Sequence, residues 1–282
     1  MHRPDHRRFR ASLVALCCGT LATPRLGAQA DRPPMWMEAS LWAGVTSLEQ
    51  TPGAIGRTSA VQSGIRGAEL SVWPVPSLRL FARYDNTFSL DNLALIRAGR
   101  SVPLYRAGVQ RDWNHASTTV ADVGRRTLPG SITQGMLTVE QVVFLPGTVA
   151  LKAGGWVGPR SDARTEWLGF GALSVPIAPR VRIEPTYFHA RSGLADERQW
   201  RALLAGEARL SSRLSLGGGA AMGHNTSITP RLTGDTRAAF ARLALSLTRR
   251  QRVQLVLNRE SAPGANTQVT LAAGFSVGVP RR

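Results

Sequence analysis

Cysteine is nearly absent from this chain of 282 residues, which contains only Cys17 and Cys18. Both lie near the N-terminus, so residues 31–282 contain no cysteine. The bulk of the chain therefore has neither a disulfide framework nor thiolate ligands for a metal ion. Its fold must be held together by hydrogen bonds and packing.

Long apolar runs are missing as well. After residue 30 no stretch approaches the roughly 20 apolar residues that a membrane-spanning helix requires. Lipid cannot satisfy the hydrogen bonds of an open backbone, so only helices and closed barrels cross membranes. If this part of the chain enters a membrane, it must therefore do so as a barrel.

The first thirty residues are organised like a secretory signal peptide. Four arginines between residues 3 and 10 precede an apolar stretch from Ala11 to Ala22, and Ala28-Gln29-Ala30 forms an A-x-A cleavage site. The apolar stretch is too short to span a bilayer as a helix. We therefore predict that residues 1–30 are removed on export and that residues 31–282 form a single β-barrel domain.

The last fifty residues show the clearest regular pattern. From Ala238 to Thr248 apolar residues alternate with polar or small ones, and the alternation returns at Val253 and from Thr267 to Val277. Successive side chains of a strand point to opposite faces, so each segment has one apolar face and one polar or small face. Such strands fit a transmembrane barrel or a half-buried soluble sheet.

Alternating segments of this kind recur from Met35 onward, separated in turn by short and longer connections. Transmembrane barrels alternate between short turns and longer loops in the same way. The pattern predicts an all-β fold: a transmembrane antiparallel up-and-down β-barrel of fourteen strands, with twelve strands as the alternative. The count of fourteen includes a weak strand at Leu93 to Arg97, and it treats Asn114 to Ser131 as a long polar loop.

Three features conflict with a simple strand pattern. Trp200 to Leu210 is rich in Ala, Leu, Glu and Arg, which favour helices. Ala238 to Leu247 can also be drawn as an amphipathic helix. We predict strands in both places, because each stands in a series of segments bounded by turns. Pro185 lies within another predicted strand, where it cannot donate a ladder hydrogen bond, and it predicts a β-bulge there.

The signal peptide, the repeated alternating strands and the final strand that closes the chain together resemble the bacterial outer-membrane β-barrel proteins, a porin-like class. The resemblance covers residues 35–278 and is one of pattern, without a motif that indicates a subfamily. It implies a location in the outer membrane, with outer-membrane lipids and small solutes as partners.

The chain is strongly basic, with a net charge of +17, and nearly all its positive charge is arginine because Lys152 is its single lysine. The arginines are spread through turns and strands. They lack the clustered basic helix, zinc motif or RNA-binding signature of a nucleic-acid-binding protein, so we expect no nucleic acid among the partners. Anionic lipid headgroups and anionic solutes are the expected partners of an exported basic protein.

Charged residues fall on the polar face of the predicted strands, which would turn toward the barrel lumen. A lumen of fourteen strands should be too wide for side chains alone to fill, and charges inside need water or a partner. We predict a passive pore for small, preferentially anionic solutes, because the inward set holds eight basic and six acidic residues. A structural barrel filled by paired charges is an alternative. The predicted pore-lining residues are Arg79, Arg83, Arg106, Glu140, Lys152, Arg182, Glu184, Glu207, Arg209 and Arg242.

No group of residues in the sequence makes a convincing catalytic or metal site. The histidines after residue 30 are His115, His189 and His224, which are too scattered to suggest metal ligation. A further alternative is an outer-membrane hydrolase with a loop-borne site of His189 and Ser192, supported by nearby carboxylates. We assign no catalytic residue, and we expect neither a metal ion nor another cofactor.

Overall fold

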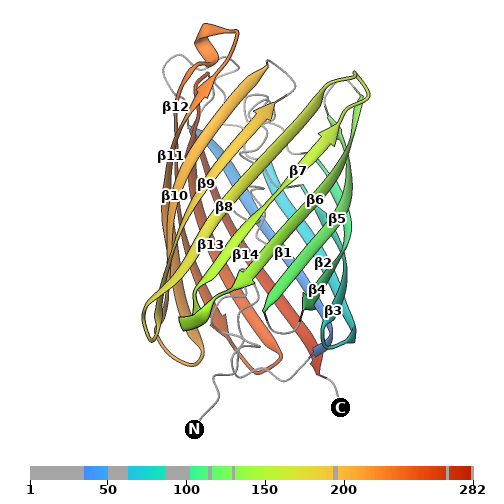
Figure 1. Ribbon diagram of the computed structural model, residues 1–282, viewed down its shortest axis with the longest axis vertical. Coiled ribbons are helices and arrows are strands. Elements are labelled where there is room, and N and C mark those ends of the chain that lie inside the picture. The colour runs from blue at the N-terminus through green and yellow to red at the C-terminus, as the bar shows by residue number, and fades with distance from the viewer. Residues whose placement is uncertain are drawn as a thin grey trace.

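A computed structural model of the chain describes residues 35–49, 63–86, 102–113, 116–128, 131–192, 196–264 and 267–280. These residues form fourteen strands in one closed sheet (Figure 1). Each strand pairs antiparallel with the strand before it, and β14 pairs with β1, so the predicted up-and-down barrel is confirmed. The strands are β1 (Met35–Glu49), β2 (Ser63–Val75), β3 (Leu78–Asp85), β4 (Leu104–Trp113), β5 (Ser117–Leu128), β6 (Ile132–Phe144), β7 (Ala150–Pro159), β8 (Thr165–Ala178), β9 (Val181–Ser192), β10 (Glu197–Arg209), β11 (Leu214–Thr226), β12 (Gly234–Ser246), β13 (Gln251–Ser261) and β14 (Thr267–Pro280).

Helix is almost absent from these residues. Two 3-10 turns of three residues each, η2 (Pro146–Thr148) and η3 (Pro230–Leu232), lie between strands. Within the described ranges no helix has both the length and the apolarity needed to cross a membrane.

The seam between the first and last strands closes the sheet. β1 and β14 pair over their whole lengths, from Met35 opposite Pro280 to Glu49 opposite Thr267, with one irregularity between Met35 and Met37. The sheet of described strands therefore has no open edge whose backbone groups lack a neighbouring strand. A closed ladder is the condition under which a β-sheet can cross lipid.

The two faces of the sheet carry different side chains. On β10, Leu204 is 58% exposed on the outer face, whereas the adjacent Leu203 is 5% exposed on the inner face. Charged and polar side chains make up much of the buried inner set. The outer face is dominated by apolar residues, among them Leu41, Leu70, Val123, Leu137, Leu151, Tyr187, Leu257 and Leu271. Such an outer wall is suited to contact with lipid.

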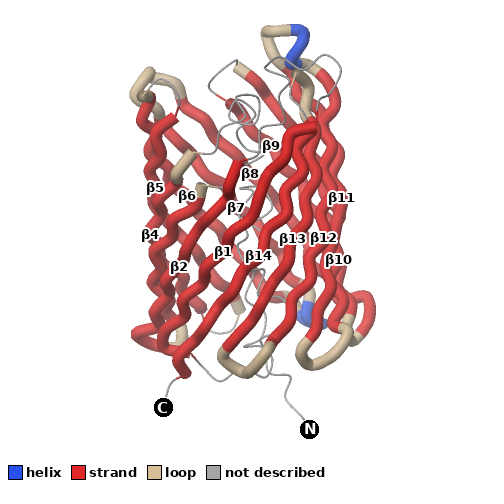
Figure 2. The backbone as a smooth tube through the Cα atoms, turned by 180° about the vertical axis from the view of Figure 1, so that it is seen from behind, coloured by secondary structure: helices blue, strands red, loops and turns tan. Residues whose placement is uncertain are grey.

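The connections are short at one end of the barrel and mostly longer at the other. At the short-turn end, Pro76 and Ser77 join β2 to β3, and residues 179–180 join β8 to β9. At the long-loop end, residues 50–62 join β1 to β2 and residues 227–233 join β11 to β12. Because the number of strands is even, β1 begins and β14 ends at the short-turn end (Figure 2).

One strand lies where the sequence pattern predicts a loop. Residues 117–128, inside the loop predicted from Asn114 to Ser131, form β5 and pair with both β4 and β6. The only large apolar residue on its outer face is Val123, so its apolar periodicity is weak. The weak strand predicted at Leu93 to Arg97 lies outside the described residues. The predicted count of fourteen strands is therefore right, but the fourteen include β5, which the sequence pattern did not predict.

The β-bulge predicted at Pro185 is also misplaced. Pro185 lies on the outer face of β9, and its register with β10 continues without a shift. Its missing N–H coincides with a gap in the pairing with β8, between Ala172 and Val175. The register shift falls instead between Pro176 and Ala178, next to the turn.

An arginine in place of Leu204 should destabilise the barrel, because this side chain points outward near the middle of β10. A charge near the bilayer midplane costs roughly 2–4 kcal/mol, against about 0–1 kcal/mol near an interface. We expect Leu204→Arg to lower the temperature at which unheated SDS samples lose the folded band. Val279→Arg, at the end of β14, is the matched control and should change this temperature little. Equal stability of the two variants would contradict a lipid-facing outer wall.

Candidate functional site: the inner wall of the barrel

The ten predicted pore-lining residues all have buried or half-buried side chains. They lie on the strand faces opposite the exposed apolar residues, so the strands direct them toward the inside of the barrel. Six are buried, and Arg79, Arg182, Glu207 and Arg209 are half-buried. Whether they line a conducting path remains a prediction, but the barrel brings most of them into ionic contacts.

One ionic cluster joins strands β2 and β3. Arg79 forms an ion pair with Glu69 and donates from Nε to the Ser71 hydroxyl at 2.9 Å. Arg83 lies 3.8 Å from the second Glu69 oxygen and donates from Nε to Asp85 at 3.2 Å. Two arginines and two acids therefore share one network, in which each charge has a partner.

Glycines give two inner aromatic rings the space they occupy. Trp42 lies opposite Gly67 in the pairing of β1 with β2, and a Cβ on Gly67 would overlap the indole. The Arg83 guanidinium lies 4.9 Å from the centre of the Trp42 ring, a cation–π distance. Gly219 likewise leaves room for the Phe240 ring, because a Cβ added to Gly219 would lie only 2.7 Å from it.

Arg106 and Asp122 form a bidentate ion pair across β4 and β5. Arg106 donates from Nε at 2.8 Å and from Nη2 at 2.6 Å to the two carboxylate oxygens of Asp122. Nη2 also donates to the Thr138 hydroxyl of β6 at 3.0 Å. Planar two-point contacts of this kind are the strongest arginine–carboxylate arrangement. Both side chains are almost fully buried, so this pair fixes three neighbouring strands.

Glu166 is the centre of a second network near the long-loop end. Its carboxylate accepts hydrogen bonds from Arg126 at 3.3 Å, Gln134 at 3.0 Å and Arg160 at 3.0 Å. Arg160 also binds Asp162 in the adjoining connection at 2.7 Å. The sequence pattern did not reveal this network, because Arg126 lies in β5, which the pattern predicts as a loop.

Two further ion pairs involve predicted pore-lining residues. Lys152 of β7 donates to Glu184 of β9 at 2.6 Å, across the intervening strand β8. Arg242 of β12 donates to Glu207 of β10 at 2.8 Å, again across one strand. Glu140 of β6 is buried near Lys152, since its strand pairs with β7 two residues away. Pairs that skip a strand run along the circumference of the inner wall.

The buried charges of the described residues balance. The half-buried charged residues balance as well, with three arginines, Arg79, Arg182 and Arg209, and three acids, Glu69, Asp112 and Glu207. The excess of two basic residues counted from alternation is therefore absent. The inner set also contains five further acids, Asp112, Asp122, Glu166, Glu197 and Glu260, but only three further arginines, Arg126, Arg160 and Arg252. The buried residues are eight basic, Arg83, Arg106, Arg126, Lys152, Arg160, Arg201, Arg242 and Arg252, and eight acidic, Glu38, Asp85, Asp122, Glu140, Glu166, Glu184, Glu197 and Glu260.

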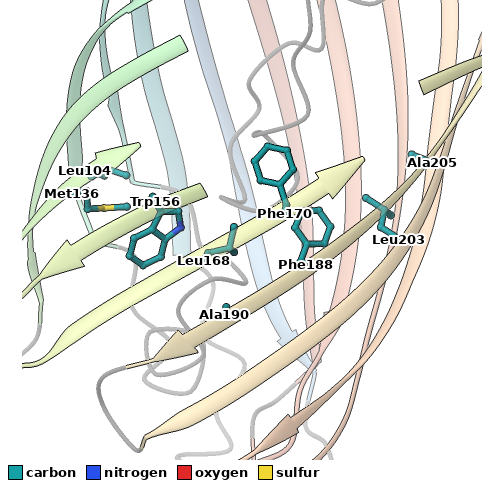
Figure 3. Packing of buried hydrophobic residues seen from close by; sticks show 9 residues of the cluster. All are labelled: Leu104, Met136, Trp156, Leu168, Phe170, Phe188, Ala190, Leu203 and Ala205. Carbon is teal, nitrogen blue, oxygen red and sulfur yellow. The ribbon is translucent and has the colours of Figure 1, made fainter. Parts of the chain in front are cut away.

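An apolar patch interrupts the polar inner wall, and sequence reasoning missed it. Figure 3 shows it running across neighbouring strands, with the rings of Phe170 and Phe188 close together. Their centroids lie 6.0 Å apart at an interplanar angle of 44°. Its members are Leu104, Met136, Trp156, Leu168, Phe170, Phe188, Ala190, Leu203 and Ala205. The signal was present in adjacent apolar pairs such as Leu203-Leu204, where both faces of the strand are apolar.

The two histidines that the structure describes, His189 and His224, do not form the catalytic pair considered from the sequence. His189 is exposed on the outer face of β9, whereas Ser192, three residues later, is buried on the inner face. The proposed His189–Ser192 pair is therefore separated by the sheet. His224 binds Asp235 at 3.0 Å near the long-loop end, and His115 lies outside the described residues. In the described ranges no group of three or more His, Cys, Asp or Glu side chains is placed to hold a metal ion.

No protein-family model matches the chain, and no curated protein matches its sequence. Solved structures do share its fold. A deletion mutant of the TodX monoaromatic hydrocarbon channel covers 94% of this chain and 98% of its own, with a TM-score of 0.62 and 10% identity. A Pseudomonas aeruginosa FadL homologue covers 95% and 98%, with a TM-score of 0.58 and 8% identity. A bacterial polysaccharide outer membrane secretin covers 88% and 99%, with a TM-score of 0.54 and 10% identity.

Breaking the Arg106–Asp122 pair should be more harmful than removing it. Loss of one partner of a buried ion pair costs about 3–5 kcal/mol, because the other charge stays buried without compensation. We expect Arg106→Gln to lower the free energy of unfolding in urea strongly, and Arg106→Gln with Asp122→Asn to restore part of the loss. Arg191→Gln is the control, since its exposed pair with Asp196 should contribute only about 0–1 kcal/mol. Strict additivity of the two inner substitutions would rule out the coupling.

Proposed function

We propose that this chain, which has the fold of outer-membrane β-barrel proteins, resides in the outer membrane as a passive pore for small solutes, with a preference for anions. The observation that carries the proposal is a closed barrel of fourteen strands, apolar outside and charged inside. Barrels of roughly eight strands are filled by their side chains, whereas those of about 16–18 strands enclose aqueous channels. Fourteen strands stand nearer to the second group.

The similar solved structures add support for a channel. The TodX protein is a channel by its description, and it shares the fold over nearly the whole of both chains. An outer membrane channel of Pseudomonas putida F1 covers 88% of this chain and 98% of its own, with a TM-score of 0.51 and 13% identity. The solute preference follows from the charges of this chain itself.

The anion preference rests on the two ends of the barrel, because the charges of its inner wall balance. Basic ends attract anions and lower the barrier for their entry. The exposed charged residues of the described ranges are thirteen arginines against three aspartates. The arginines are Arg66, Arg111, Arg125, Arg164, Arg180, Arg191, Arg198, Arg213, Arg231, Arg237, Arg249, Arg250 and Arg259, and the acids are Asp162, Asp196 and Asp235.

A filled structural barrel is the second candidate function, and one observation favours it. The inner aromatic side chains Trp156 and Phe188 are only 5% and 7% exposed. Large side chains on the wall of a wide aqueous lumen would expose more of their surface to water. A filled barrel conducts no ions, so a conductance measurement separates the two candidates.

The test is a reversal potential across a planar bilayer under a salt gradient. We expect the wild type to conduct, with anions favoured at low salt and the preference fading as salt approaches 1 M, where the Debye length falls to about 3 Å. Replacing the four turn arginines Arg180, Arg213, Arg249 and Arg250 by glutamine should reduce the preference. Thr248→Ser, which keeps the hydroxyl that accepts from the Arg250 amide, is the matched control.

Each outcome has a separate meaning. Cation preference in the wild type, or an unchanged reversal potential in the four-residue variant, would show that the turn arginines do not set selectivity. Absence of any conductance in a correctly folded, membrane-inserted barrel would establish the filled structural barrel instead.

A further inference from the structure

Two arginines face each other on the outer wall at the long-loop end. Arg191 of β9 and Arg198 of β10 are directly opposite in the ladder, and both are exposed. Like charges in directly opposed positions destabilise a sheet. Arg191 has a partner, since its Nη2 lies 2.6 Å from Asp196. Within the part of the chain that the structure describes, no hydrogen bond or ion pair joins the Arg198 side chain to another residue, so two arginines and one aspartate leave a net positive charge here.

Aromatic side chains lie beside this arginine pair and at the next outward-facing position toward the middle of the barrel. Trp200 and His189 are directly opposite each other on the same two strands, and Trp167 of β8 is opposite Arg191. The Trp167 and His189 rings meet edge to face, with centroids 5.2 Å apart at 82°. Trp200 is 43% exposed, and below these rings the outer face continues with apolar residues such as Leu204.

This order of side chains matches the layers of a membrane interface. Tryptophan and tyrosine gather where the hydrocarbon meets the headgroups, as in the girdles of outer-membrane barrels. Arginines placed just beyond such a girdle lie at the depth of the lipid phosphates. A guanidinium presents a planar fork of donors that fits phosphate oxygens in two-point contacts.

We infer that Arg191, Arg198, His189, Trp167 and Trp200 form a headgroup site that binds the phosphate of an anionic membrane lipid. A phosphate between the two guanidiniums removes their repulsion, because each then contacts an anion. The neighbouring rings border the apolar part of the same lipid. The inference rests on the proposed insertion into the membrane, but pore formation plays no part in it.

The experiment reconstitutes the full barrel in phosphatidylcholine with a minor fraction of phosphatidic acid, extracts it, and counts retained lipids by native mass spectrometry. We expect the wild type to retain phosphatidic acid in preference to phosphatidylcholine. Arg191→Gln with Arg198→Gln should reduce that preference several-fold. Arg213→Gln with Arg249→Gln, which removes two exposed arginines at the opposite end, is the matched control and should retain it.

A thermal measurement keeps the test independent of folding defects. In phosphatidylcholine alone, Arg198→Gln should lose its folded SDS band at the same temperature as the wild type or a higher one, because a like-charge contact is gone. Phosphatidic acid should raise that temperature for the wild type and much less for the variant. Inorganic phosphate at matched concentration should not reproduce the rise.

Several results would overturn the site. Unchanged lipid preference in the Arg191/Arg198 variant, or an equal loss in the opposite-end control, would show only diffuse attraction. A full effect of inorganic phosphate would indicate a site for a free anion. A protein that does not insert into vesicles at all would instead refute the proposed function.

Discussion

The backbone hydrogen bonds of the seam between β1 and β14 are the constraint on which the rest of the structure depends. An unpaired strand edge is prohibitively costly inside lipid, so a sheet that crosses a membrane must close. Closure gives every strand one face toward the outside and one toward the inside. Once the outer face is apolar, ionic side chains near the middle of the strands must point inward, and there they require partners.

The positions of the charges follow from that division. Every glutamate whose side chain the structure describes is buried or half-buried on the inner face. The inner arginines balance these acids, as in the bidentate contact of Arg106 with Asp122. The surplus of arginine in the described residues is left on exposed positions toward the two ends of the barrel. In the described residues the net positive charge therefore lies toward the ends of the barrel, and it is the basis of the proposed anion preference and of the proposed lipid site.

Strand alternation predicted much of this fold because closure reinforces it. Trp200 to Leu210 has the composition of a helix, yet residues 197–209 form β10, since neighbours on both sides offer ladder partners. Alternation also placed the ten predicted residues on the inner face. It failed for β5, whose outer face has only Val123 as a large apolar residue. It failed again at the apolar patch, where Leu203 and Leu204 are equally apolar but face opposite ways.

The individual contacts could not be predicted, because they depend on register between strands. Arg106 meets Asp122 only because β5 exists and pairs with β4 in one alignment. Lys152 reaches Glu184 across an intervening strand, a relation that no spacing in the sequence reveals. The balance of inner charges could not be predicted either, because it depends on every inward position. Asp122 and Arg126, for example, lie on β5, which the pattern did not predict.

The most direct test of the account is a disulfide across the seam. Cys17 and Cys18 are the only native cysteines, and both lie in the predicted signal peptide. Ala43 of β1 and Ala273 of β14 are directly opposite and exposed. Ala43→Cys with Ala273→Cys should oxidise to an intramolecular disulfide, visible as a shift on non-reducing gels after boiling. Ala43→Cys with Ala241→Cys, which lies on β12, should not. Failure of the first pair, or equal cross-linking of both, would contradict the closed fourteen-strand barrel.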